Sequence, residues 1–299
     1  GFIKQNKIEI VHAHLARDYP LAAIAVRLCK ARVKLVLTRH VLFPINGLHK
    51  FMLPRGATFI AVSNAVRESL LARKIVAPNA IKLIHNGVDT RHFGSVKRSF
   101  NRALFLEKLR LPLNRRYVGI IGEITAHKGQ SDFVCAAAMI AEKHSDVDFL
   151  IVGADSSREK THKGELEKLV EELNLTRRVH FLGWHADVAP ALCALDVFVS
   201  ASRIEPFGLV IVEAMAVGLP IVATKSEGSQ EILADGETAK IVPIKDAKAI
   251  ANAVSEFLDN AEMSQNFGKK ARDAARAKFD LARMTAETEK VYQEVWRND

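Results

Sequence analysis

The chain has 299 residues, 48% of them hydrophobic, and a formal net charge of +9 at pH 7. This length and composition can bury a large core and indicate two domains. No stretch approaches the roughly 18 to 20 consecutive apolar residues of a membrane-spanning helix, and no signal-peptide core is seen, so we expect a cytoplasmic protein.

Positive charge is concentrated in the first third of the chain. Residues 1–100 hold 17 Lys and Arg against 4 Asp and Glu, whereas residues 101–299 hold 26 against 30. An apolar run, residues 41–44, lies within the densest basic segment. The basic residues of that segment are Arg27, Lys30, Arg32, Lys34, Arg39, Lys50 and Arg55. Such a surface suits an anionic membrane face or a lipid-linked acceptor, or is simply solvated. Nucleic acid is disfavoured, because no nucleic-acid-binding motif accompanies the charge.

Short apolar stretches alternate with helical segments along the chain. We expect strands at residues 8–13, 34–38, 58–62, 81–84, 117–121, 148–152, 178–182, 196–200, 220–223 and 239–242. We expect helices at residues 209–217, 247–258, 264–279 and 281–297. This alternation predicts α/β architecture, with parallel sheets covered by helices on both faces.

Domain boundaries follow from the same pattern. Residues 94–115 are charged and less periodic, which predicts a linker with a short helix. We therefore expect a partial N-terminal domain at residues 1–93, a C-terminal domain at 116–279 and a final helix within 280–299. The three cysteines lack CxxC spacing, so we expect reduced thiols rather than metal ligands or a disulfide.

Three histidines fall at predicted strand ends in the N-terminal domain. His12 and His14 are two residues apart and share one face of a strand end, and His40 closely follows the strand at 34–38. Because no third ligand stands at a recognisable spacing, we favour structural or cleft-lining roles over a metal site.

Glycines follow several predicted strands of the C-terminal domain. In the string GEITAHKG, Gly122 would let the backbone approach a diphosphate, and Lys128 could neutralise a departing diphosphate without a metal ion. Gly153 follows the next strand and is expected to line the same cleft. Trp184 follows the strand at 178–182, where it could cap the sheet. Lys-Gly pairs also occur in ordinary exposed turns.

Residues 200–223, SASRIEPFGLVIVEAMAVGLPIVA, lead from a strand into a helix and carry two glutamates, Glu205 and Glu213. Backbone N–H groups of Phe207, Gly208 and Leu209 would point toward a phosphate, and Gly208 permits close approach. Glu205 precedes this anion site and Glu213 follows it. A nucleoside diphosphate sugar needs this order, with one carboxylate for sugar hydroxyls and another for the ribose. The alternative is an αβ unit with solvated acids.

The segment resembles the glutamate-pair signature of the retaining glycosyltransferases of family 4. The matching residues also include Pro206, Phe207, Gly208, Ala214, Met215, Gly218 and Pro220. The resemblance implies the GT-B fold, in which two Rossmann-like domains face a cleft and the last helix crosses back to the N-terminal domain. It further implies that Glu205 contacts the transferred sugar, Glu213 the ribose and His40 the donor sugar. The nucleobase would lie near Trp184.

The chain departs from the family pattern at two places. Glu123 stands where the family has an arginine, and Arg203 and Arg39 are the candidates to replace that cation. The chain also opens where the family's N-terminal domain is already partly built, which leaves the expected acceptor side incomplete. An exposed sheet edge there would favour self-association.

We therefore predict a retaining, metal-independent glycosyltransferase without a cofactor, using a nucleoside diphosphate sugar, in the first place a UDP-sugar. Its acceptor would be a glycan or lipid-linked hydroxyl in cell-surface polysaccharide or glycolipid synthesis, reached from the cytoplasm, peripherally at the inner membrane face. The alternatives are a non-catalytic or truncated donor-binding domain, an epimerase or hydrolase of the same fold, and a basic membrane or nucleic-acid adaptor.

Overall fold

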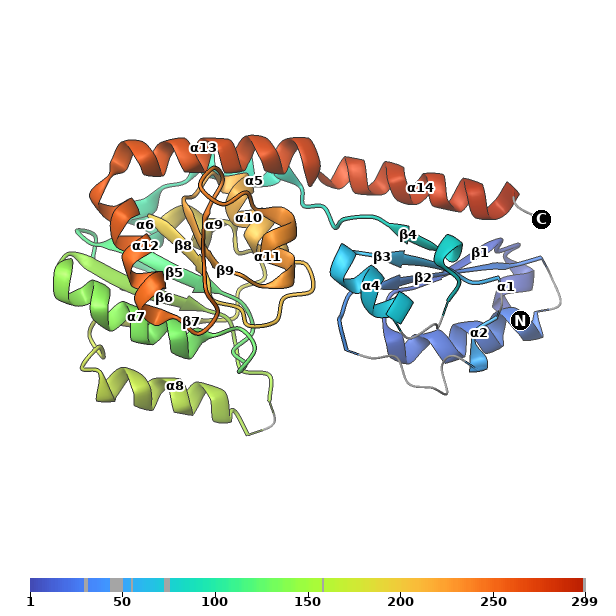
Figure 1. Ribbon diagram of the computed structural model, residues 1–299, viewed down its shortest axis with the longest axis horizontal. Helices are drawn as coiled ribbons and strands as arrows, with labels where there is room; N and C mark the ends of the chain where they lie inside the picture. The colour runs from blue at the N-terminus through green and yellow to red at the C-terminus, as the bar shows by residue number, and fades with distance from the viewer. Residues whose placement is uncertain (30–31, 44–50, 55, 73–75, 158, 298–299) are drawn as a thin grey trace. The chain divides into compact units, whose positions relative to one another are not determined.

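The computed structural model describes residues 1–29, 32–43, 51–54, 56–72, 76–157 and 159–297. The chain divides into two compact units (Figure 1). The first unit combines Gly1–Gly87 with Leu281–Asp299, and the second is Val88–Asp280. Of the predicted basic segment, Lys30, Pro44, Lys50 and Arg55 lie outside the described residues.

The first unit is built on a four-stranded parallel sheet in the order β1-β2-β3-β4. Its strands are β1 (Ile10–Ala13), β2 (Lys34–Arg39), β3 (Thr58–Ala61) and β4 (Ile81–Leu83). Its helical elements are α1 (Phe2–Gln5), η1 (Ala16–Asp18), α2 (Tyr19–Leu28), α4 (Asn64–Ala72), η2 (Pro78–Ala80) and α14 (Leu281–Arg297). Helix α2 contacts β1 and β2, and α4 contacts β3 and β4, as expected for parallel strands joined by crossover helices.

Helix α14 belongs to the first unit although it comes last in the chain. Its apolar residues recur at helical spacing, and Val291 and Val295 pack on Val36, Ile60 and Ile84 of the sheet and strand ends. This packing places the final helix on the N-terminal unit.

The second unit contains a six-stranded parallel sheet in the order β10-β9-β8-β5-β6-β7. Its strands are β5 (Arg116–Ile121), β6 (Val147–Val152), β7 (Val179–Gly183), β8 (Val197–Ser200), β9 (Ile221–Thr224) and β10 (Lys240–Val242). From β5 the chain builds outward through β6 and β7, and from β8 it builds outward on the other side. The strand order therefore reverses between β5 and β8, and in open α/β sheets ligands bind at such a reversal.

Helices cover both faces of this second sheet (Figure 1). The helices are α5 (Thr90–Ser99), α6 (Arg102–Lys108), α7 (Gln130–Lys143), α8 (Thr161–Glu172), α9 (Ala189–Ala194), α10 (Leu209–Val217), α11 (Glu227–Ile232), α12 (Ala247–Asp259) and α13 (Ala261–Lys278). Helix α7 packs on α8 and α12, and α10 packs on α5, α9 and α13. The larger core cluster joins the strands to α7, α8 and α12, with Phe133 and Phe149 edge to face.

The boundary between the units falls earlier than the predicted linker at residues 94–115. Those residues form most of α5 and all of α6, which pack on α9 and α10 within the second unit. Asp89 caps α5 by accepting from the N–H groups of Arg91 and His92, and Asn101 caps α6. Both helices are short and rich in charged residues, and Phe93 and Leu106 mark their buried sides.

Among the described residues, no helix combines the length and apolar character needed to cross a membrane.

Candidate active site

Lys128 and Glu205 meet between the loops that follow β5 and β8, where the strand order reverses. Lys128 Nζ lies 2.6 Å from Glu205 Oε2, and Ser202 Oγ donates to the same oxygen over 3.2 Å. Glu205 is only 6% exposed, so its charge requires this neighbouring cation. The structure thus brings together two predicted site residues that are 77 positions apart in the sequence.

The loop carrying Glu205 is held by direct backbone packing against α11. The N–H of Gly228 donates to the carbonyl oxygen of Glu205 over 2.8 Å. A Cβ on Gly228 would lie 2.1 Å from the carbonyl oxygen of Phe207, so only glycine allows this approach. Gly228 was not singled out from the sequence, because a glycine near the start of a helix has no local signal for such packing.

Helix α10 begins directly after this loop. Gly208 precedes it with φ +103°, in the left-handed region that favours glycine. The Phe207 side chain is buried and packs edge to face on Phe279, so its backbone is the part available to a ligand. Leu209 is the first residue of α10 and is exposed. The unsatisfied N–H groups of a first helical turn favour an anion at this position.

Strand-end glycines let neighbouring loops touch through their backbones. A Cβ on Gly153, after β6, would stand 1.9 Å from the carbonyl oxygen of Gly122, after β5. Gly153 also has φ +141°, and Gly129 before α7 has φ +68° with the carbonyl oxygen of Ala201 only 2.0 Å from its missing Cβ. The loops after β5, β6 and β8 therefore form one closely packed backbone surface.

Glu213 lies on α10, and its surroundings shift its protonation equilibrium. Burial, reinforced by the negative charge of Asp187, raises the pKa of Glu213 to about 7. Asp187 accepts from the N–H of Ala189, the first residue of α9, and a carboxylate oxygen of Asp187 lies 3.4 Å from His92 Nε2. Near neutral pH the carboxyl group of Glu213 therefore changes between its protonated and ionised forms.

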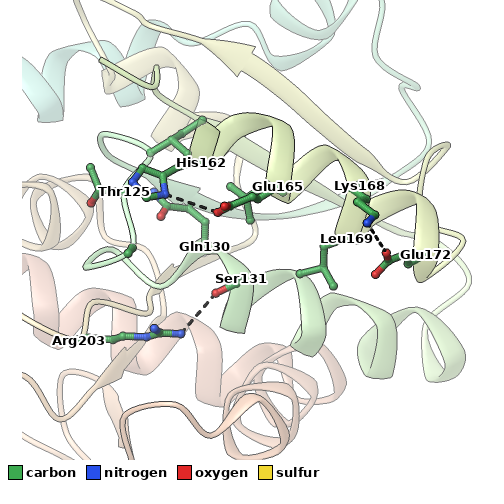
Figure 2. A pocket seen from close by; sticks show the side chains of 12 residues that line it. Thr125, Gln130, Ser131, His162, Glu165, Lys168, Leu169, Glu172 and Arg203 are labelled. Atoms are coloured by element: carbon green, nitrogen blue, oxygen red, sulfur yellow. Dashed lines mark hydrogen bonds and ion pairs between the residues drawn. The ribbon is translucent and has the colours of Figure 1, made fainter. Parts of the chain in front are cut away.

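Arg203 is engaged away from the pair of Lys128 and Glu205. Its guanidinium donates to both carboxylate oxygens of Asp132, at 3.0 and 3.1 Å, and to Ser131 Oγ. Figure 2 shows its side chain directed toward Ser131 at the start of α7. The N–H of Arg203 also donates to the carbonyl oxygen of His127. Arg203 thus links the loops after β5 and β8, and its charge is balanced by Asp132.

Glu123 also turns to its own neighbours. Its carboxylate accepts from Ser156 Oγ, and its carbonyl oxygen accepts from Gln130 Nε2 over 2.8 Å. Arg39, the other candidate for the missing family arginine, belongs to the first unit, where it is buried and donates to the carbonyl oxygen of Phe43. Both candidates, Arg203 and Arg39, therefore already have hydrogen-bond partners in this structure.

A cavity of about 490 Å³ borders this loop region (Figure 2). It is lined by residues 124–126, the start of α7, one side of α8 and Arg203. Its lining includes none of Lys128, Glu205 and Glu213, so it adjoins the candidate site without containing it.

Trp184 follows β7, the edge strand of the second sheet, after Gly183 with φ +72°. Its side chain is 72% exposed, which leaves the ring available for stacking. A role in covering a nucleobase stays a prediction.

Three histidines of the first unit, His12, His14 and His40, line a cavity of about 500 Å³. His12 Nδ1 lies 2.6 Å from the hydroxyl of Tyr292, and His12 Nε2 lies 2.7 Å from Thr38 Oγ1. His14 Nδ1 lies 3.3 Å from His40 Nε2. Tyr292 comes from α14, 280 residues away in the sequence, so no local pattern could indicate its part in this cluster.

The environment keeps two of these histidines neutral. Burial, with smaller contributions from His14 and His40, lowers the pKa of His12 to about 4. Burial, followed by His14 and Arg39, also lowers the pKa of His40. Both ring nitrogens of His12 are used in hydrogen bonds, and the described part of the chain holds no group of three metal-ligating side chains arranged around an ion.

Comparisons with known proteins cover both units. Residues 101–274 match the family model described as Glycosyl transferases group 1, and residues 1–92 match Glycosyltransferase Family 4. The chain is 28% identical to N-acetyl-alpha-D-glucosaminyl L-malate synthase of Bacillus anthracis, over 99% of this chain and 77% of that protein. It is also 28% identical to the lipopolysaccharide core biosynthesis mannosyltransferase LpsB of Rhizobium meliloti, over 86% and 68% respectively. Anabaena HepE in complex with UDP and glucose superposes with a TM-score of 0.85 at 25% identity, covering 97% of this chain and 79% of that one.

Proposed function

Since the chain belongs to the group 1 glycosyltransferases and has the GT-B fold, we propose that it is a retaining enzyme that uses a nucleoside diphosphate sugar. The sugar would pass to an acceptor hydroxyl in cell-surface polysaccharide or glycolipid synthesis. A UDP-sugar is the favoured donor, supported by the UDP and glucose bound in HepE. The named activities of the synthase and of LpsB support a sugar-transfer reaction of this kind.

The observation that carries this proposal is the pair of Lys128 and Glu205 at the reversal of strand order. The ammonium group of Lys128 balances the buried carboxylate of Glu205. A bound donor gives each a second partner, because the diphosphate attracts Lys128 and the sugar hydroxyls donate to Glu205. Charge and hydrogen-bonding capacity are thus present before the donor arrives, which is the preorganisation that electrostatic catalysis requires.

Glu213 would bind the ribose. It lies on α10, beyond the anion-favouring start of that helix, and its ionised form can accept hydrogen bonds from both ribose hydroxyls. The pKa of about 7 means that donor binding draws this group into its ionised form at neutral pH.

The bond changes need no protein nucleophile. The bond between the anomeric carbon and the phosphate oxygen breaks as the acceptor oxygen bonds to that carbon on the same face. The acceptor proton passes to the leaving phosphate oxygen. Lys128 and the start of α10 would stabilise the negative charge on the departing diphosphate, so that this step proceeds without a metal ion.

The first unit would supply the acceptor side. His40, whose pKa is lowered by burial, would contact the donor sugar. The basic residues of this unit would favour a glycan or lipid-linked acceptor at an anionic inner membrane face. We also propose that the first unit self-associates through the free edge of β1; a monomeric mass in solution scattering would contradict this.

Glu123 favours a second candidate function, donor binding without transfer. An acidic residue where the family has an arginine weakens the attraction for a diphosphate, as expected of a protein that binds the donor without transfer. Hydrolysis or epimerisation of the donor is the related enzymatic alternative.

Proton NMR of UDP-glucose incubated with the protein would separate these functions, because water can act as the acceptor. A retaining transferase releases the α-anomer of glucose first, and Lys128→Ala should reduce the rate while the exposed-site control Glu237→Gln leaves it unchanged. Initial release of the β-anomer would contradict retention. An altered nucleotide sugar would identify an epimerase, and an intact donor with saturable line broadening would identify a binding domain.

A further inference from the structure

A cationic pocket lies in the second unit, where α5 approaches the end of α13 (Figure 1). Arg91 and Arg98 of α5 and Arg276 of α13 line it, together with Thr90 and Gly94, around a cavity of about 410 Å³. None of these residues belongs to the candidate active site described above.

Gly94 brings two of the guanidinium groups together. One terminal nitrogen of Arg98 and one of Arg276 each lie 3.6 Å from the point where a Cβ of Gly94 would stand. The two nitrogens are therefore separated by at most twice that distance. All three arginines are exposed, so solvent weakens the repulsion between these positive groups, and a bound anion would offset what remains.

In the described part of the chain, Arg91, Arg98 and Arg276 form no direct ion pair with an acidic side chain. Two carboxylates near the pocket accept hydrogen bonds from neutral donors: Asp89 from backbone N–H groups of α5, and Asp280 from Thr90 Oγ1. Helix α5 contains no acid, and residues 268–278 carry five basic residues against Asp273 alone.

We propose that this pocket binds a phosphate group, either inorganic phosphate or the phosphate of a small phosphorylated ligand. A planar guanidinium group can donate two hydrogen bonds to two oxygens of one phosphate. Three guanidinium groups from two helices can therefore surround one anion. The anion would offset the positive charge of the three arginines and join α5 to α13.

The position of the pocket gives this site a regulatory consequence. The second unit begins at Val88 and ends at Asp280, and these two residues pair with each other as an isolated bridge. The N–H of Val88 also donates to the carbonyl oxygen of Phe279 over 2.9 Å. A phosphate held by α5 and α13 would therefore stabilise the two segments by which the chain enters and leaves the second unit.

The test is an NMR titration of the whole chain with inorganic phosphate and with pyrophosphate, following the backbone amides of residues 90–99 and 272–280. We expect saturable shifts in both segments. The double variant Arg98→Gln with Arg276→Gln should weaken the affinity at least about tenfold, because charge-assisted hydrogen bonds are lost. The matched control, Lys97→Gln with Lys278→Gln, removes the same charge from the same helices at residues outside the pocket lining.

Two further measurements separate this site from the donor site and identify the source of the phosphate. Lys128→Ala removes a cation from the donor site, so retention of the shifts in that variant shows that the new site is independent of the proposed function. Vesicles of phosphatidylcholine with and without phosphatidic acid distinguish a lipid phosphate from a soluble one. Absence of shifts with phosphate, pyrophosphate and phosphatidic acid alike, or equal weakening by the arginine and lysine variants, would overturn the proposal.

Discussion

Replacing Glu213 by glutamine is expected to stabilise the second unit at and above neutral pH. Burial raises the pKa of Glu213 from its ordinary 4.5 to about 7, so the folded protein favours the protonated form. Below pH 4.5 the group is protonated in both folded and unfolded chains and costs nothing. As the pH rises from 4.5 to 7 the unfolded chain ionises first, and stability is lost progressively. Glutamine resembles the protonated form and has no such cost.

The increase in pKa corresponds to a stability cost of about 3 kcal/mol once the pH exceeds 7, at 1.36 kcal/mol for each pH unit. At pH 5 the cost is less than about 1 kcal/mol, because the unfolded chain is then only partly more ionised. For a unit of this size, the full difference raises the melting temperature by roughly 6 to 12 °C. Differential scanning calorimetry of wild type and Glu213→Gln at pH 5 and pH 8 measures both values.

The control is Glu237→Gln, which removes a charge from an exposed position of the same unit. A stabilisation by Glu213→Gln that grows between pH 5 and pH 8 supports the buried, proton-binding carboxyl group. An effect of equal size at both pH values, or a destabilisation at pH 8, would refute the reasoning, because it would mean that Glu213 is ionised within the fold at no cost.

Three other changes have defined outcomes. The affinity of the protein for a UDP-sugar should rise between pH 6 and pH 8, because ionised Glu213 binds the ribose better than the protonated form does. Calorimetric titration of wild type and Glu213→Gln measures this rise, and an equal rise in the variant would contradict the prediction. Gly153→Ala should destabilise the second unit and weaken donor binding, because the new Cβ would lie 1.9 Å from the carbonyl oxygen of Gly122, whereas Gly164→Ala at an exposed position of α8 should stabilise the unit by about 0.5 to 1 kcal/mol. Urea denaturation should give different midpoints for the two variants, and similar midpoints would count against the backbone packing. Tyr292→Phe should lower the unfolding free energy of the first unit by about 1 to 3 kcal/mol, because His12 Nδ1 loses its partner; an unchanged urea midpoint would show that this contact is absent in solution.

All ten strands were predictable because buried parallel strands read as continuous apolar runs, as in Val147–Val152, which is buried throughout. The bounds of α10 and α14 were also predicted correctly. For residues 94–115 the sequence predicted a linker with one short helix, whereas the structure has most of α5 and all of α6 there, both in the second unit. Their packing on α9 and α10 depends on contacts between distant parts of the chain, which local sequence does not show.

The candidate site shows the same limit. Glu205, Gly208 and Lys128 stand in strings whose local chemistry indicates a phosphate and a sugar. The partners of these strings come from elsewhere in the chain. Asp132 binds Arg203 from 71 residues away, a pairing that no spacing rule supplies. Such contacts depend on how the strand-end loops meet, which is a property of the folded sheet.

The central claim is that Lys128, Glu205 and Glu213 form a site for a nucleoside diphosphate sugar. Calorimetric titration with UDP-, GDP- and ADP-sugars, on wild type, Glu213→Ala and the control Glu237→Ala, tests it most directly. The account predicts saturable binding of one nucleotide class to wild type and control, with binding lost or reduced at least about tenfold in Glu213→Ala. Binding that is unaffected by Glu213→Ala, or no binding by any of these sugars to wild type, would contradict it.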